Sequence, residues 1–463
     1  MVMITRLTFK TCNMALSGMA LVILVMPALA QQPDSTRAAT PFIVSTAPKV
    51  GATPTNSRLS WAQALQAARE NLDVSLARQA FGAAQADILA ADRAPFPVLT
   101  TKASQIDLQN GIGPGNTLTQ KRIDKAIGVD WTYERGNKRE LRTRVAQRSA
   151  AAAQADLENI RGQQVLAASG AFFDLLSAQD RIEQVMGIER SSALLATTAA
   201  RRVSAGDLSA QEAARTEIEA QRAKSDVLLA QLDGQRAGLA LAQLIRRPDQ
   251  LGSTALQVLP DWPNQTNTTP LTETTIAALI DQRADIRAAV ERVQAAQALV
   301  ENASAQRKAD ITVGSSFDHY PGTSTRLLEL RVQMPLQWNY NYEGEIGRAQ
   351  AQLAQAQDAL DKTRLIAGSE MQRLQQELAG TAQRTQAYEV EILPRARRVA
   401  ENAELAYGKG AIPLTDLIDA RRTLRATLLD ALSARADHAK ALSFWQLRTD
   451  PQSLPGRMAS DSP

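Results

Sequence analysis

The stretch from about Lys138 to about Ala205 constrains the fold most strongly, because it is nearly seventy residues long and contains no proline. Its apolar residues recur every three or four positions, the spacing of one face of an α-helix. They include Leu141, Val145, Leu157, Ile160, Phe172, Leu175, Leu176, Ile182, Val185 and Met186. One helix of this length would measure about 100 Å, at a rise of about 1.5 Å per residue. The sequence therefore predicts a protein built on very long helices rather than a compact globule.

A second stretch of this kind runs from about Glu343 to Tyr407, and both are embedded in the same order of elements. Each follows a helix and a β-hairpin and precedes a tight turn and another helix. The flanking helices are predicted at residues 59–93, 209–247, 273–308 and 414–448. Gly206 and Gly410 hold equivalent places in the two turns, 204 residues apart. We therefore predict two internal repeats, at residues 58–248 and 273–448, joined by a linker at 249–272.

The N-terminus has the pattern of a secretory signal peptide. Arg6 and Lys10 precede a short apolar run, and a small-x-small cleavage site lies just before Gln31. We expect residues 1–30 to be removed; a membrane anchor is the alternative, although the apolar run is too short to span a bilayer comfortably.

Loss of the signal peptide leaves a nearly neutral chain without cysteine. The formal net charge of +4 would fall to about +2 with the loss of two cations, too small a bias to favour nucleic acid as a partner. The only cysteine, Cys12, lies before the cleavage site. Residues 31–57 are predicted to form a flexible leader and residues 449–463 a loose tail. Such an exported chain is either soluble in the periplasm or a β-barrel in the outer membrane.

Two β-hairpins are predicted, at about residues 96–134 and 311–338, and their return strands alternate between apolar and polar residues. One apolar face is formed by Ile123, Ile127, Val129, Trp131 and Tyr133, and the other by Leu328, Leu330, Val332, Met334, Leu336 and Trp338. Two hairpins supply four strands, too few to close a barrel, and an open edge is not tolerated in lipid. A membrane-inserted form of this chain therefore requires an oligomer.

Aromatic residues gather at the end of each return strand. Trp131 and Tyr133 end the first, and Trp338 and Tyr340 follow in the second. Aromatic side chains at one height are typical of the interface between a membrane and water. The alternative is that these four residues cap the sheet of a soluble protein.

One motif indicates a family. The run Tyr407-Gly408-Lys409-Gly410-Ala411-Ile412-Pro413-Leu414-Thr415-Asp416-Leu417-Ile418-Asp419-Ala420 matches the Y-x-x-G-(x)5-D-x-x-D-A pattern of the TolC family. The first repeat carries Gly206, Asp207 and Leu208 in the equivalent turn, followed by Glu212. Over residues 58–448 the chain resembles a TolC-family outer-membrane efflux channel, and Gly136-Asn137-Lys138-Arg139 is closer to the heavy-metal (CzcC-like) branch.

The resemblance implies a mainly α-helical fold with a small β part. Three copies would form an α-helical tunnel in the periplasm, continued by a 12-stranded β-barrel in the outer membrane. It also implies four kinds of partner: sister subunits of a homotrimer, outer-membrane lipid, a periplasmic adaptor protein and an inner-membrane pump of the RND type.

The resemblance further implies a gate at the two turns, residues 203–209 and 407–413. Asp416 and Asp419 match the family's acidic ring, and Tyr407 and Glu212 match positions that link neighbouring helices in the closed state. Adaptor docking is implied for Gly206, Asp207, Leu208, Gly410, Ala411 and Ile412. Ile412 stands where a basic residue can join the closed-state latch in the family, so the resemblance does not extend to a salt bridge at this position. The alternative for Asp416 and Asp419 is a solvated helix start.

No catalytic constellation is present in the sequence, so an enzyme is not expected. The two histidines, His319 and His438, share no metal-ligand spacing with each other or with cysteine, and we predict neither a bound metal nor a cofactor. The predicted function is passive export of metal cations or small toxic compounds through a tripartite efflux system. Alternatives are the outer-membrane component of type I protein secretion and a periplasmic coiled-coil protein without a pore.

Overall fold

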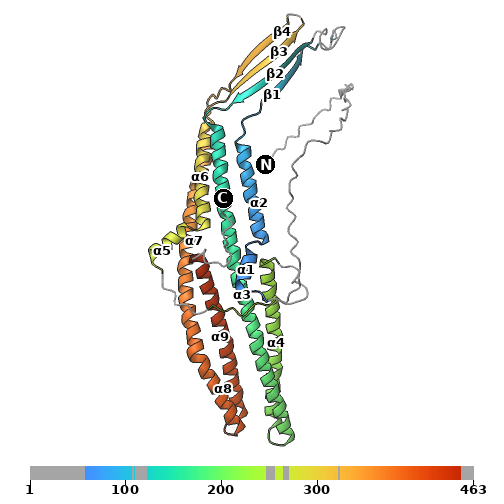
Figure 1. The fold of residues 1–463 in the computed structure, drawn as a ribbon, viewed down its shortest axis with the longest axis vertical. Coiled ribbons are helices and arrows are strands. Elements are labelled where there is room, and N and C mark those ends of the chain that lie inside the picture. The colour runs from blue at the N-terminus through green and yellow to red at the C-terminus, as the bar shows by residue number, and fades with distance from the viewer. Residues whose placement is uncertain are drawn as a thin grey trace, which may run out of the picture. The chain divides into compact units, whose positions relative to one another are not determined.

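The computed structural model describes residues 58–106, 109, 123–246, 256–263, 271–321 and 324–449, which all belong to one compact unit at residues 56–463. The predicted signal peptide, the leader and nearly all of the predicted tail lie outside the described residues. Within the described ranges the chain is mainly α-helical with one small antiparallel sheet, as the sequence predicted (Figure 1).

The first helical segment is two helices rather than the single predicted helix at residues 59–93. Helix α1 (Trp61–Ala68) starts at Ser60, whose side chain accepts a hydrogen bond from the Gln63 backbone, and α2 (Leu72–Ala91) starts at Asn71. Asn71 Oδ1 accepts from the backbone N–H of Asp73 at 2.6 Å and of Val74 at 3.4 Å. This capping arrangement requires an extended backbone at Asn71, and it interrupts the helix there.

The helix predicted at residues 273–308 is also divided, into α5 (Glu273–Asp281) and α6 (Ala284–Ala305). Arg283 lies between them with an extended backbone. Its guanidinium is 2.9 Å from Asp285 and 2.8 Å from Glu370 of α7 (Glu343–Gln386). These ion pairs hold the break between α5 and α6 against α7.

The two long helices differ in regularity. Helix α3 (Lys138–Ser204) is continuous and returns through α4 (Ala210–Leu244). Its counterpart is α7, a π-helical segment η2 (Ala387–Ile392) and α8 (Leu393–Gly408), which returns through α9 (Leu414–Thr449). Pro394 stands at the start of α8. Because proline has no N–H to donate to the preceding turn, it favours a local departure from the α-helical pattern.

The sheet has the strand order β1-β2-β3-β4, and all neighbouring strands are antiparallel. Its strands are β1 (Val98–Ser104), β2 (Asp124–Tyr133), β3 (Ile311–Tyr320) and β4 (Ser324–Gln333). The prediction that the last strand continues to Trp338 is wrong, because β4 ends before Pro335, which cannot donate a ladder hydrogen bond.

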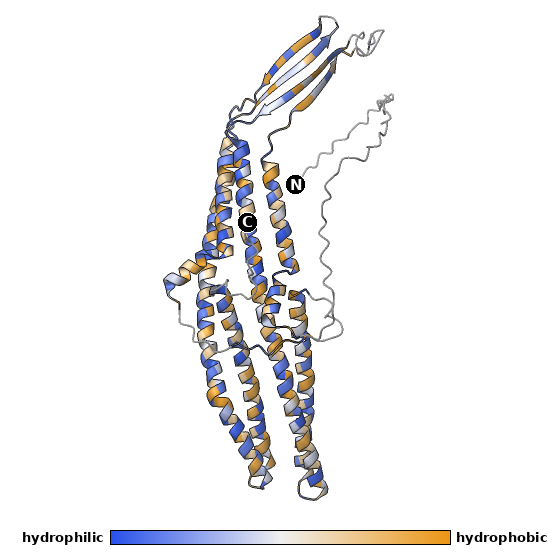
Figure 2. Cartoon of the chain, in the orientation of Figure 1, coloured by the Kyte–Doolittle hydropathy of each residue, from blue (hydrophilic) through white to orange (hydrophobic). Residues whose placement is uncertain are grey.

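The register gives the sheet two chemically different faces, and Figure 2 shows hydrophobic and hydrophilic residues alternating along the strands. The apolar face contains Leu99, Ile127, Val129, Trp131, Val313, Phe317, Leu328, Leu330 and Val332, all of which are exposed. On the polar face, Asp130 Oδ2 accepts a hydrogen bond from Thr100 at 2.5 Å, and Asp130 Oδ1 accepts one from Arg331 at 2.7 Å. Gly314 lies between Asp130 and Arg331, where an added Cβ would come within 2.1 Å of Asp130 Oδ1.

A buried polar chain joins the two halves of the sequence midway along α3. Trp61 Nε1 donates to Ser169 Oγ at 3.0 Å, and Ser169 Oγ donates to Ser443 Oγ of α9 at 3.0 Å. The surrounding core includes Phe172 and Phe173, and the Phe173 ring stacks on Trp262 at a centroid distance of 6.2 Å. Large buried side chains and satisfied polar groups therefore hold α1, α3 and α9 together at this level.

Candidate functional site: a gate at the two helical turns

The turn after α3 is closed by backbone hydrogen bonds around Gly206, whose φ is +80°. The Gly206 N–H donates to the carbonyl of Val203 at 3.0 Å, and the Asp207 N–H donates to the carbonyl of Arg202 at 2.9 Å. This is the Schellman arrangement, in which glycine readily supplies the left-handed residue after a helix. The sequence SAGD at this point is therefore a helix stop with a defined geometry.

The turn after α8 repeats this geometry at Gly410, whose φ is +75°. The Gly410 N–H donates to the carbonyl of Tyr407 at 3.0 Å, and the Ala411 N–H donates to the carbonyl of Ala406 at 2.8 Å. Each turn reverses the chain within a few residues, so α3 with α4 and α8 with α9 form two helical hairpins (Figure 1). We call them the first hairpin (α3/α4) and the second hairpin (α8/α9).

A cation links the two hairpins close to both turns. Arg202 Nη1 donates a hydrogen bond to Tyr407 Oη at 3.1 Å, and the Arg202 guanidinium carbon lies 5.5 Å from the centre of the Tyr407 ring. A hydrogen bond and a cation–π contact of this kind are each worth about 1 kcal/mol. The sequence singled out Tyr407 but missed Arg202, whose only signal was its place in the last turn of a long helix.

A small apolar core supports this link. Leu414, Leu417 and Ile418, at the start of α9, are buried. The partly buried side chains that pack on them come from both hairpins: Leu195 from α3, and Ala403 and Tyr407 from α8. Together with Arg202 and Tyr407 these contacts hold the first hairpin against the second.

Two arginines of α9 form further links to the first hairpin. Arg422 pairs with Glu219 of α4, and Arg425 pairs with Asp226 one turn of helix further from the tip. Helical periodicity alone cannot pair residues that lie more than 190 positions apart. The sequence therefore gave no signal for these four residues. The links lie further along α9 from the turn than the apolar core, so the two hairpins are joined at two levels.

A third arginine of α9 ties the second hairpin internally and also reaches the first. Arg421 Nη2 is 2.8 Å from Glu404 Oε1 of α8, and Arg421 Nη1 donates to the Ser191 carbonyl of α3 at 3.4 Å. The three arginines thus present cations to α8, α3 and α4 in turn.

The paired side chains of Glu219 and Arg422 have shifted pKa values. The hydrogen bond from Arg422 holds the pKa of Glu219 below its usual range, with a further contribution from Arg222. The same hydrogen bond, with Asp419 contributing, raises the pKa of Arg422. Glu219 is therefore ionised at neutral pH, and the link is charged under ordinary conditions.

The predicted gate carboxylates lie at the start of α9 on its exposed side. Asp416 is exposed, and its Oδ1 accepts a hydrogen bond from Thr415 Oγ1 at 3.4 Å. The Asp419 side chain is 73% exposed and lies 3.5 Å from Arg422. Glu212, predicted to link helices, instead accepts from the Ser209 hydroxyl at 2.8 Å in the capping box of α4. Asp416 and Asp419 are thus both open to solvent in this chain.

The other predicted docking residues line the turns themselves. Asp207 and Ala411 are exposed, and Leu208 and Ile412 are half-buried.

The four predicted belt residues lie near the ends of strands β2 and β4. Trp131 and Tyr133 belong to β2, whereas Trp338 and Tyr340 lie beyond the end of β4. All four are exposed. The Tyr340 ring lies 5.4 Å from that of Tyr342, the residue directly before α7. The belt residues thus stand where strands give way to helices.

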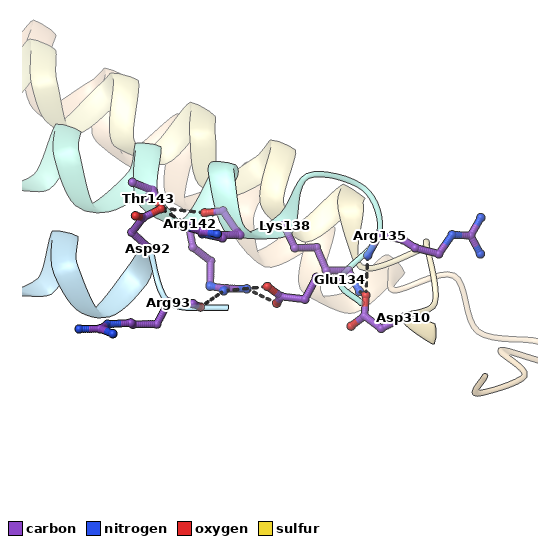
Figure 3. A network of polar contacts seen from close by, with 9 residues as sticks. Asp92, Arg93, Glu134, Arg135, Lys138, Arg142, Thr143 and Asp310 are labelled. Carbon is purple, nitrogen blue, oxygen red and sulfur yellow. Dashed lines mark hydrogen bonds and ion pairs between the residues drawn. The ribbon is translucent and has the colours of Figure 1, made fainter. Parts of the chain in front are cut away.

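Charged residues connect the sheet to the helices at this junction (Figure 3). Lys138, the first residue of α3, is buried, and its Nζ lies 2.8 Å from Asp310 Oδ1. Arg142 makes two contacts with Glu134, at 2.5 Å and 3.1 Å, and this pairing raises the pKa of Arg142. A bidentate ion pair of this kind fixes the relative orientation of the two side chains, so strand β2 is held firmly to the start of α3.

No metal cluster and no membrane-spanning helix are found in the described residues. Within these ranges no three His, Cys, Asp or Glu side chains lie together in a way that could hold a metal ion. None of the helices described here is long and apolar enough to cross a membrane.

Comparison with known proteins identifies the class. No protein-family model matches the chain. It is 25% identical over 367 residues to the cobalt-zinc-cadmium resistance protein CzcC of Cupriavidus metallidurans, covering 77% of this chain and 82% of CzcC. A membrane protein from Pseudomonas aeruginosa has a similar structure, with a TM-score of 0.72 at 16% identity over 86% of this chain and 99% of that one. The Campylobacter jejuni CmeC outer membrane channel has a TM-score of 0.68 at 15% identity, over 85% and 89% of the two chains.

The fold is that of an outer-membrane channel. The predicted resemblance to the TolC family of outer-membrane efflux channels is confirmed at the level of the fold, and a location and a transport role for this chain are proposed below. The matched proteins are described as resistance, membrane and channel proteins, which supports the expectation that this chain is not an enzyme.

Proposed function

We propose that this chain is one subunit of a homotrimeric exit channel, built from two internal repeats. The observation that supports this most directly is the sheet, which has an exposed apolar face, a polar face and two unpaired edge strands, β1 and β4. An open edge in lipid leaves backbone groups unsatisfied, so the edges require sister subunits. Three copies of four strands give a 12-stranded barrel, and the paired long helices continue it as a tunnel through the periplasm.

The cargo we propose is a divalent metal cation, and the channel conducts it passively. The relative CzcC is a cobalt-zinc-cadmium resistance protein, and the start of α9 presents the exposed carboxylates of Asp416 and Asp419. In a trimer these residues would contribute six carboxylates to a narrow entrance, because each of three subunits supplies two. A ring of carboxylates attracts cations without holding them in a closed coordination shell.

The gate opens when the second hairpin separates from the first. The link of Arg202 to Tyr407 and those of Arg422 and Arg425 to α4 favour the closed arrangement. The turns at Gly206 and Gly410, with Asp207, Leu208, Ala411 and Ile412, form the docking zone for a periplasmic adaptor. The adaptor in turn connects to an inner-membrane pump of the RND type, which supplies the energy for transport.

A conductance experiment tests the carboxylate entrance. The full-length protein and the Asp416→Ala/Asp419→Ala variant are recorded in planar bilayers while a divalent cation is added to the side that faces the turns. We expect cation block of the wild type and weaker block of the double variant. The control is Asp430→Ala, which removes an exposed carboxylate from the same helix outside the entrance. Equal block of all three proteins would exclude Asp416 and Asp419 from the entrance.

The assembly is tested separately by fractionation and mass measurement. The proposal requires recovery in the outer membrane and a detergent-solubilised mass near three times that of the chain. Recovery in the soluble periplasm as a monomer would favour the alternative of a coiled-coil protein without a pore.

A further inference from the structure

Charge is divided unequally between the two faces of the sheet. The acidic residues of the strands, Asp124, Asp130, Asp318 and Glu329, occupy register positions on the polar face. On the apolar face the strand alternation places no acidic residue among the described positions. Its ionisable side chains other than Tyr133 include Lys125 of β2 and His319 of β3. The two faces are therefore distinct in sign as well as in hydrophobicity.

Lys125 and His319 are neighbours. They are paired directly across β2 and β3, next to the apolar pair of Ile127 and Phe317. The Lys125 ammonium is shielded from water and has no hydrogen-bond partner among the described residues. An ammonium shielded from water gains from a hydrogen-bonded anion, and a lysine side chain is long enough to turn toward an anion outside the sheet.

The position of Lys125 on β2 sets how far Lys125 and His319 lie from the aromatic residues at the other end of the strand. Eight residues separate Lys125 from Tyr133, which is about 27 Å along a strand at about 3.4 Å per residue. With a strand tilt of about 40°, the separation along the membrane normal is about 20 Å, close to the apolar height of about 25 Å in outer-membrane barrels. Trp131 and Tyr133 mark the helix-side interface, so Lys125 and His319 lie near the opposite interface.

We propose that Lys125 and His319 bind a phosphate group of the phosphorylated glycolipid in the outer leaflet of the outer membrane. This inference goes beyond export and rests on the proposed function for the placement and direction of the sheet in the outer membrane. The acyl chains would lie on Ile127, Val129, Phe317 and Leu328, while the ammonium and imidazole donate hydrogen bonds to phosphate oxygens. Charge-assisted hydrogen bonds of this kind are the strong class. The absence of acids on this face removes the repulsion that an anion would meet on the polar face.

The test measures lipid binding to the full-length protein by native mass spectrometry. The probes are bis-phosphorylated lipid A, its dephosphorylated form, phosphatidylglycerol and inorganic phosphate. We expect preferential binding of bis-phosphorylated lipid A, weakened about tenfold or more in Lys125→Gln/His319→Gln, as the loss of charged hydrogen bonds predicts. Lys125→Arg keeps the charge and should retain binding.

The matched control is Lys102→Gln, since Lys102 pairs with Ala126 at the same height but on the polar face. Equal binding of lipid A by the wild type and the double variant, or equal binding of the dephosphorylated form, would overturn the proposal. So would equal binding of phosphatidylglycerol by the wild type. Conductance of the same preparations is recorded in parallel. A failure of the channel proposal would then appear as absent conductance, independently of lipid preference.

Discussion

Arg202 and Tyr407 are 205 residues apart in the sequence, yet the Arg202 guanidinium donates a hydrogen bond to the Tyr407 hydroxyl at 3.1 Å. The contact lies within one chain and joins the first hairpin to the second. A link inside one subunit makes the closed arrangement a property that each chain carries into an assembly. Sequence similarity had indicated Tyr407 alone, and the structure supplies its partner.

Removal of this link should favour the open state. In Tyr407→Phe the hydroxyl is lost and the ring remains, so we expect a change of about 1 kcal/mol, or roughly fivefold in the open-to-closed ratio. Arg202→Leu should have a larger effect because it also removes the cation–π contact. Single-channel recording gives both ratios. Arg201→Ala, an exposed neighbour in the same turn, serves as the control, and an equal effect of that change would argue against a specific latch.

Acid should loosen the pair of Arg422 with Glu219. Because the hydrogen bond from Arg422 lowers the pKa of Glu219, the pair's contribution is complete above the usual glutamate pKa of about 4.3 and is lost as pH falls through the folded value. Open probability measured from pH 7 to pH 3 should therefore rise only in the acid range. In Glu219→Gln it should already be raised at pH 7 and should lack this component of the pH dependence. A wild-type transition centred near neutral pH would point to another group.

Gly410 should tolerate no β-branched residue. Its φ of +75° lies in the left-handed region, where an L side chain costs about 1–2 kcal/mol. Gly410→Val should raise the hydrogen-exchange rate of the Ala411 amide, which bonds to the Ala406 carbonyl at 2.8 Å. Gly408→Ala is the control, because Gly408 lies two residues earlier, ends α8 and has open space around it. If Gly410→Val left the Ala411 amide protected, the left-handed turn would not be required.

His438 should make folding stability depend on pH near neutrality. The residue is buried on α9 with Thr381 Oγ1 3.5 Å from its Nδ1, and burial lowers its pKa although Glu389 opposes the shift. An unfolded histidine, with a pKa of about 6.5, takes up a proton before the folded one, so stability falls as pH drops below that value. The melting temperature should decline from pH 7.5 to 5.5, and less steeply in His438→Leu. An unchanged slope would assign the dependence to other groups.

The sequence determined most of the architecture because its signals are local. The proline-free run after Asn137 predicts α3 almost to the residue, since helical periodicity and the absence of breakers act along a single segment. The glycines at 206 and 410 predict the turns for the same reason. The division of the first helix at Asn71 was missed because an asparagine inside a helical pattern is ambiguous until its side chain is seen to cap the next helix.

The contacts of the candidate gate were predicted less completely, because they are non-local. Tyr407, Asp416 and Asp419 were found through a motif, but Arg202, Arg422 and Arg425 resemble the many other arginines of an exposed helix face. Only the packing of two hairpins shows that these three side chains bridge them. Glu212 has a local capping role in this chain, and its predicted link to a neighbouring helix stays a prediction.

The salt concentration around the protein should affect the arginine links between the two hairpins. Arg422 and its neighbours are partly exposed, so dissolved salt screens their attraction to the first hairpin. The Debye length is about 30 Å at 0.01 M salt and about 8 Å at 0.15 M. Dilute salt would therefore strengthen the attraction between the two hairpins and concentrated salt would weaken it, without any change in the protein.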